Sequence, residues 1–240
     1  MLVAHRNGMA VSGGWTNPYV TDGLVAMWDG EWNAGGGVHD AAATEWKDIA
    51  GADTTGANDL IIASDNTWSE KCLNRINRSQ SSAYNSTPIT GVKTFEFVIG
   101  IDNPSSTAWA YPITLGTSFD NPENRIIQLW ARGVNSIQGR LGQDGFSLPE
   151  LANTSPTILA VQFTYGSDNL ANLCMVNGTQ RESIGRRDQS GGYTGGVNLV
   201  YNANYQNTQR YYTIRVYNRA LTAEEIARNY AIDKARSNLP

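Results

Sequence analysis

The sequence has few of the residues that build reactive or cross-linked sites. Only two of its 240 residues are cysteine and only two are histidine. Cys72 and Cys174 allow at most one disulfide, a domain of this size does not depend on one, and the sequence leaves their pairing open. Neither residue type shows the spacing of a zinc site, and no Gly-x-Ser-x-Gly segment is present to expose a serine. Thiol, zinc and serine catalysis therefore lack support.

Positive charge and long apolar runs are also scarce. The chain has 18 basic and 22 acidic residues, and its net charge is -4. The basic residues are scattered, so a nucleic-acid partner lacks its electrostatic footprint. Apolar stretches such as 158–161 are far shorter than the roughly 20 residues of a membrane-spanning helix, which argues against membrane insertion. Signal peptides begin with a basic segment followed by an apolar block. The start of the chain has no such pattern, so we expect no signal peptide in it.

Short stretches of alternating polarity, separated by Gly, Asn, Pro and Asp, fill most of the chain. In 93–101, Phe95 lies on one face and Glu96 on the other, a period of two that predicts a half-buried strand. The segment 211–218 alternates in the same way, with Tyr212 on the core face together with the residues at 214 and 216. Many such strands joined by turn residues predict an antiparallel sandwich or jelly roll.

One segment near the C-terminus has helical signals instead. Thr222 and Glu225 are spaced as a capping box, and Leu221 and Ile226 occupy the two positions of a hydrophobic staple. Apolar residues recur at 223, 226, 227, 230 and 231, which is the spacing of one helix face. The sequence predicts an amphipathic helix over roughly 223–236 that packs on the sandwich.

Two Asn-Gly pairs indicate tight turns. The second, at 177–178, follows a predicted strand. The first, Asn7-Gly8, lies between two short runs and predicts a hairpin at the start of the chain. We therefore divide the chain into a hairpin and linker arm, 1–22, and one domain, 23–240. The arm residues expected to act in assembly are His5, Arg6, Asn7 and Trp15.

Three parts of the sequence resemble the laminin G-like branch of the concanavalin A-like lectin and glucanase superfamily. The segments 23–30, 46–51 and 58–60 are similar to the family's opening strand and its "W-x-D-x-(S/A)-G…N-D" segment. The segment 174–178 is similar to its "Y-V-N-G" hairpin, and 214–226 closely matches how these domains end. The resemblance implies an all-β, two-sheet antiparallel jelly-roll sandwich with a short C-terminal helix. It also implies that loops or a concave face bind glycans or protein surfaces, sometimes with a calcium ion at the rim.

The carboxylates argue against catalysis. Glycosidases of this superfamily use two carboxylates on one face, about 5 to 5.5 Å apart in retaining enzymes. Glu96 is the only glutamate within a clear strand, and Val98 and Gly100 follow it on its own face. The sequence therefore predicts a protein that is not an enzyme, with a glycoside hydrolase as the less favoured alternative.

Aromatic residues in loops are the informative ones for a binding role, because an indole ring stacks on the apolar face of a sugar. The predicted ligand-binding residues are loop aromatics and a polar neighbour: Trp32, Trp68, Trp109, Tyr111 and Asn33. Tryptophans at strand-like positions are expected in the core: Trp28, Trp46 and Trp130.

Acidic loop residues raise the question of calcium, the one cofactor that the sequence suggests. Asp29, Asp40 and Asp48 lie close together in the sequence and offer oxygen ligands of the kind calcium takes, although no EF-hand register is present. The alternative is that Asp29 and Asp48 fix loops by accepting backbone N–H bonds.

Two function classes follow from these observations. The first is a recognition module that binds glycans or a protein surface. The second is a structural or attachment component of a larger particle, such as a bacteriophage virion, held by its N-terminal arm and in contact with other subunits. The absence of a signal peptide and of an appended enzyme favours including the second class. Either class places the protein outside the cell or on a virion surface.

Overall fold

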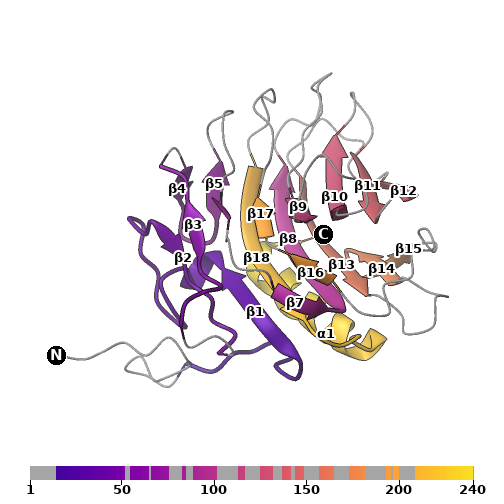
Figure 1. The fold of residues 1–240 in the computed structure, drawn as a ribbon, viewed down its shortest axis with the longest axis horizontal. Coiled ribbons are helices and arrows are strands. Elements are labelled where there is room, and N and C mark those ends of the chain that lie inside the picture. The colour runs from indigo at the N-terminus through magenta and orange to yellow at the C-terminus, as the bar shows by residue number, and fades with distance from the viewer. Residues whose placement is uncertain are drawn as a thin grey trace.

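Antiparallel strands make up most of the regular structure in the described residues, and an α-helix lies at the C-terminal end of the chain (Figure 1). The computed structural model describes residues 15–51, 55–64, 66–75, 83–84, 89–101, 113–116, 125–131, 137–141, 144–148, 157–164, 173–181, 193–195, 197–199 and 209–239. The predicted hairpin at Asn7-Gly8 lies outside these residues. Within them, the strands form two large sheets and one small pair, β7 (Ile89–Val92) with β16 (Tyr193–Gly195).

The first sheet has the order β15-β14-β13-β8-β18-β5-β4, and β1 also pairs with β18. Its strands are β1 (Leu24–Asp29), β4 (Asn66–Trp68), β5 (Leu73–Arg75), β8 (Thr94–Ile101), β13 (Thr157–Thr164), β14 (Leu173–Val176), β15 (Thr179–Arg181) and β18 (Gln209–Tyr217). All pairings in this sheet are antiparallel. A single turn of 3-10 helix, η1 (Gly30–Trp32), follows β1.

The second sheet has the order β12-β11-β10-β9-β17-β6-β3-β2. Its strands are β2 (Glu45–Trp46), β3 (Leu60–Ile62), β6 (Ala83–Tyr84), β9 (Ile113–Gly116), β10 (Arg125–Ala131), β11 (Ile137–Leu141), β12 (Asp144–Leu148) and β17 (Val197–Leu199). Trp46 joins the two sheets at one edge. Its indole N–H donates to the carbonyl of Asp29, and its ring meets Trp68 of β4 edge to face at 5.3 Å.

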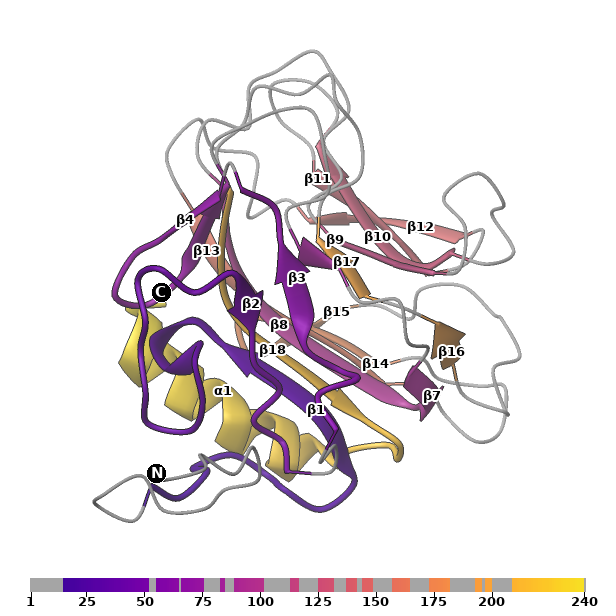
Figure 2. The same ribbon diagram turned by 60° about the vertical axis from the view of Figure 1, so that its left-hand side comes forward.

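Helix α1 spans Ala223–Ser237 and runs along the first sheet (Figure 2). The Thr222 hydroxyl accepts a hydrogen bond from the Glu225 N–H, and the Glu225 carboxylate accepts one from the Thr222 N–H. The capping box is thereby confirmed. The hydrogen bonds from Arg219 lower the pKa of Glu225 to about 2. Leu221 and Ile226, the predicted staple pair, both lie in one buried cluster.

The buried face of α1 differs from the predicted apolar stripe. Ala227 and Ala231 are exposed, whereas Ile226, Asn229 and Asp233 are buried. The reason lies in the sheet beneath the helix, which presents charged side chains to α1. A polar buried face on the helix therefore matches a polar strip on the sheet.

Strands β8 and β18 also depart from the half-buried pattern, because both of their faces are buried. One face of β8 carries Phe95 and packs inside the sandwich, and the other carries Glu96 and is covered by α1. A bulge in β18 between Tyr211 and Thr213 moves Tyr212 to the helix side, where it packs against Leu239. The prediction that Tyr212 shares the inner face with the residues at 214 and 216 is therefore wrong.

A buried ion network connects the sheet to the helix. Arg215 of β18 donates from Nε to Glu96 at 2.8 Å and from both terminal nitrogens to Asp233 at 2.9 and 2.6 Å. The three side chains are at most 1% exposed. The Tyr19 hydroxyl also donates to Asp233, and its ring lies 4.0 Å from the Arg215 guanidinium.

Residues 15–22, predicted as part of a linker arm, pack into the domain. Tyr19 and Val20 are buried in the same cluster as Met27 and Ile226. The Val20 N–H donates to Asn229 of α1 at 3.0 Å. This segment therefore ties the start of the described chain to its final helix.

Replacing Arg215 tests how much the network contributes. Arg215→Met removes the cation of the buried Asp233 and a hydrogen-bond donor of the buried Glu96, and we expect a loss of about 3–5 kcal/mol in the free energy of unfolding. The control is Arg228→Met on the exposed side of α1, which should change it by less than about 0.5 kcal/mol. Urea denaturation measures both, and equal effects would contradict the importance of the buried ion.

The turn between β14 and β15 contacts α1 directly and supplies a second test. Asn177 and Gly178 have φ values of 49° and 72°, as an Asn-Gly turn requires. A Cβ at Gly178 would lie 2.6 Å from Cε1 of Tyr230, whereas a Cβ at Gly91, whose φ is 68°, would meet open space. Gly178→Ala should therefore cost about 1–3 kcal/mol more than Gly91→Ala in thermal unfolding, because only the first crowds a neighbour.

Candidate functional site

Trp32 follows Glu31 in η1 and takes part in an internal stack. The guanidinium of Arg236 lies 4.0 Å from the centre of its ring, and Trp15 meets it edge to face at 5.1 Å. Two hydrogen bonds to Asp29, at 2.7 and 2.8 Å, hold Arg236 in this position. The ring is thus used inside the protein, although the sequence predicts it as a ligand contact.

Asn33, also predicted to contact a ligand, is a clamp for the glycine-rich loop. Its side-chain amide is fully buried, and Nδ2 donates to the Asp40 carbonyl at 2.8 Å. Its Oδ1 accepts from the Asp40 N–H at 2.7 Å. Because the Asn33 amide is fully buried and both of its polar atoms bind backbone, it is not placed to contact a ligand.

Trp68, like Trp32, is partly exposed, and a surface imidazole rather than a guanidinium lies beside its ring. Its indole ring donates through the N–H to the Ala43 carbonyl at 2.9 Å. The exposed imidazole of His39 meets it edge to face at 6.4 Å. Trp46 packs against it from within the core. We call the pair Trp68 and His39 the aromatic platform.

The imidazole of His39 has a defined hydrogen-bonding role. Its Nδ1 lies 3.0 Å from the Gly30 carbonyl, which can only accept, so Nδ1 carries the hydrogen. In the neutral ring, Nε2 is then an acceptor for a ligand hydroxyl. Sequence reasoning placed His39 in a loop but gave it no role, because its contact with Trp68 arises only from the fold.

The remaining tryptophans are placed as follows. Trp28 and Trp46 are fully buried, which confirms them as core residues. The Trp130 side chain, and Trp109 and Tyr111 altogether, lie outside what the structure describes.

The three aspartates offered as calcium ligands do not form a site together. The structure shows no group of three or more His, Cys, Asp or Glu residues, among those it describes, that could hold a metal ion. The Asp29 carboxylate accepts from Arg236 and from the Thr213 hydroxyl, and caps η1 through the Glu31 N–H. Asp40 accepts from the Ala42 N–H.

Asp48 fixes a loop against the first sheet. Its Oδ1 accepts from the backbone N–H groups of Met27 and Ala50 at 2.8 and 2.9 Å, and Oδ2 accepts from the Asn58 amide at 3.1 Å. This is the alternative role in which a carboxylate satisfies backbone donors. The same holds for Asp29 at η1.

Asp48→Ala distinguishes these two roles. The substitution leaves the buried N–H of Met27 without its acceptor, so we expect a loss of about 1–3 kcal/mol in stability. Because the lost partners are backbone N–H groups, the loss should be the same in calcium and in chelator. A calcium-dependent difference between wild type and variant, measured by melting temperature, would restore the metal role of Asp48.

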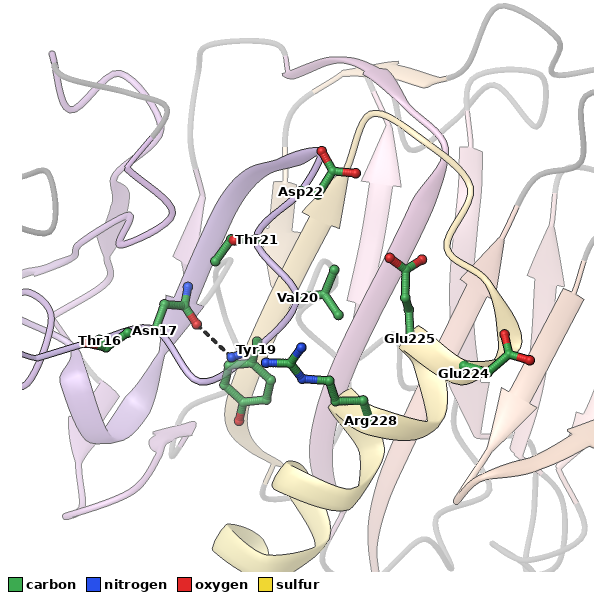
Figure 3. A pocket seen from close by; sticks show the side chains of 9 residues that line it. All are labelled: Thr16, Asn17, Tyr19, Val20, Thr21, Asp22, Glu224, Glu225 and Arg228. Carbon is green, nitrogen blue, oxygen red and sulfur yellow. Dashed lines mark hydrogen bonds between the residues drawn. The ribbon is translucent and has the colours of Figure 1, made fainter.

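A pocket of about 560 Å³ lies between residues 16–22 and the start of α1 (Figure 3). It is lined by Thr16, Asn17, Tyr19, Val20, Thr21, Asp22, Glu224, Glu225 and Arg228. Asp22 and Glu225 both pair with Arg219, at 2.8 and 2.6 Å. Its aromatic residue, Tyr19, is only 2% exposed, so the pocket has polar groups but no ring face for stacking. No local sequence pattern predicts this pocket, because its walls come from segments about 200 residues apart in the chain.

Of the arm residues predicted for assembly, only Trp15 is described. It packs on Gly36, where an added Cβ would lie 2.4 Å from its ring, and it contacts Trp32. His5, Arg6 and Asn7 lie outside the described residues, so the assembly role of the arm stays a prediction.

One acidic pair that the fold brings together is out of a substrate's reach. Glu96 and Asp233 share Arg215 beneath α1, and each side chain is at most 1% exposed. A glycosidase needs its acid and its nucleophile beside the scissile bond. This pair is structural.

Among the described residues, the helix found is too short and too polar to cross a bilayer.

Comparison with known proteins gives a likeness in fold. No family model matches the chain, and no curated protein matches its sequence. The Trypanosoma rangeli sialidase in complex with sialic acid aligns with a TM-score of 0.64 at 13% identity, over 92% of this chain and 35% of the sialidase.

Two binding domains also align. The botulinum neurotoxin serotype D ligand-binding domain, in complex with N-acetylneuraminic acid, has a TM-score of 0.58 at 14% identity over 90% of this chain and 52% of its own. The binding domain of Paraclostridial Mosquitocidal Protein 1 has a TM-score of 0.58 at 12% identity, over 88% of this chain and 52% of that binding domain. The chain thus spans 35% to 52% of these proteins. It shares their β-sandwich fold.

Proposed function

We propose that this chain is a non-catalytic recognition module of the laminin G-like jelly-roll type, which binds glycans through the aromatic platform of Trp68 and His39. The observation that carries the proposal is the placement of a partly exposed indole beside an exposed imidazole. A sugar stacks its C–H face on an indole ring and directs its hydroxyls to nearby polar atoms. The platform offers both kinds of contact.

Rigidity supports this choice of site. The Trp68 indole N–H is held by the Ala43 carbonyl, and the His39 imidazole by the Gly30 carbonyl. Side chains fixed before binding lose less conformational entropy when a ligand arrives. Trp32, by contrast, already stacks on Arg236 within the protein.

The comparisons support a glycan as the ligand class. Two of the similar structures were solved with sialic acid or N-acetylneuraminic acid, and one of these is an enzyme. Fold likeness does not transfer an activity, so the choice of a binding role rests on the site. The second candidate, a glycoside hydrolase, is favoured by the sialidase likeness and is decided by an assay for turnover. A glycan ligand also carries our proposal that the protein acts outside the cell or on a virion surface.

A glycan array with matched variants tests the proposal. Wild type should bind at least one glycan, and Trp68→Ala should weaken that binding about tenfold or more, a loss of ~1.4 kcal/mol or more. His39→Ala should weaken it less, because one acceptor is lost and the ring face remains. Arg228→Ala and Glu224→Ala, in the pocket of Figure 3, are the controls and should bind as wild type does.

Several outcomes would decide against the proposal. Loss of binding in the pocket variants, with Trp68→Ala unaffected, would move the site to the pocket of Figure 3. Cleavage of a bound glycan by wild type would make the protein a hydrolase. Circular dichroism of each variant must show a folded domain, since Trp68 also packs on Trp46.

A further inference from the structure

The buried network beneath α1 contains one carboxylate more than its cations balance. Among the buried carboxylates, Arg215 forms a two-point pair with Asp233, and Arg236 forms one with Asp29. Arg236 also pairs with Glu31, whose side chain is 39% exposed to solvent. Each two-point pair is neutral. Glu96, whose side chain is fully buried, then adds a negative charge that neither pair neutralises. A buried charge without a counter-ion is costly, so the protein has to remove it or compensate for it.

The two oxygens of Glu96 have unequal surroundings. Oε2 accepts hydrogen bonds from Arg215 Nε and from Asn229 Nδ2, both at 2.8 Å. Oε1 is buried and has no hydrogen-bond partner among the described residues. An ionised carboxylate spreads its charge over both oxygens, so leaving one without a donor disfavours the charged form. A proton on Oε1 would remove that charge.

Among the described residues, the groups that face Glu96 do not offer a second cation. Arg215 and Tyr217 approach it from β18, and Asn229 and Asp233 from α1. On β13 its partner in register is Gln162, which does not titrate. The segment 15–22 contributes Tyr19, which faces Arg215 and Asp233. Arg236 reaches Tyr19 and Asp29 but makes no contact with Glu96 that the structure shows.

We propose that Glu96 is a proton-dependent latch, neutral when α1 and residues 15–22 are docked on the first sheet, so that docking takes up one proton. Burial, with a further contribution from the negative charge of Asp233, raises the pKa of Glu96 in the folded protein, although Arg215 acts in the opposite direction. The buried Oε1 without a hydrogen-bond partner and the raised pKa both favour the protonated form of Glu96. The device strengthens the docked state in mild acid and loosens it as the pH rises.

The sign follows from proton linkage. Glutamate in an unfolded chain has a pKa of about 4.3. Between that value and the raised pKa of the folded state, the folded protein holds a proton that the unfolded chain has lost, so stability falls as the pH rises. One proton changes the unfolding equilibrium constant by about tenfold for each pH unit in this window. Above the folded-state pKa the effect reaches a plateau.

Glu96→Gln tests the latch, because a glutamine amide keeps the acceptor oxygen for Arg215 and Asn229 and cannot ionise. We would measure urea unfolding of the full chain from pH 4.5 to 8, with Glu224→Gln, at an exposed position, as the control. The ratio of the wild-type unfolding constant to that of Glu96→Gln should rise with pH, by up to about tenfold per unit. The ratio for Glu224→Gln should stay flat, and both histidines cancel in these ratios.

A ratio that does not change with pH, with Glu96→Gln less stable than wild type throughout, would overturn the proposal, since it means that Glu96 is charged in the folded state. If Glu96→Gln does not fold, wild type answers the question through carbon-13 NMR of its nine glutamate carboxyl groups. One resonance should titrate well above the usual range for glutamate. Titration of all nine within that range, or below it, would equally overturn the latch.

Discussion

A single buried guanidinium determines how the helix and the sheet fit together. Arg215 is fixed on β18 opposite Glu96 of β8 by the strand register. Its two remaining nitrogens point to Asp233, so α1 can dock in only one position along its axis if the charge is to be paired. Hydrophobic contacts alone tolerate sliding, whereas a buried ion does not. The final helix is therefore placed by an electrostatic constraint, with Tyr19 stacked against the same cation.

The aromatic platform depends on this docking through a chain of contacts. Once α1 is in place, Arg236 in its last turn reaches back to Asp29 and stacks on Trp32. Those contacts hold η1, whose first residue, Gly30, presents the carbonyl that orients His39. A surface imidazole is thus positioned by a salt bridge on the far end of a helix. A side chain that is already held in place loses less conformational entropy when a ligand binds, which favours binding at a surface that makes few contacts.

Features that depend on residues close together in the chain could be predicted from the sequence. The capping box at Thr222, the turn at Asn177-Gly178 and the buried Trp28 each follow from residues close to one another in the chain. The burial of β8 did not follow, because alternation describes one strand and cannot show that a helix covers its polar face. Trp32 and Trp68 look alike in sequence, each with polar neighbours. Only the fold brings Arg236 over Trp32 and His39 beside Trp68, while both rings stay partly exposed.

The fold does not by itself determine the function, because the function depends on a few side chains that come together from distant parts of the chain. A sandwich can present either carboxylates or aromatic rings to a sugar, and which it presents depends on a few side chains. Among the described residues, Glu96 and Asp233 are used to hold the helix, and Asp48 fixes a loop. Groups committed to buried donors cannot also transfer protons to a substrate. What is left facing solvent at the platform is an indole and an imidazole, which suits binding.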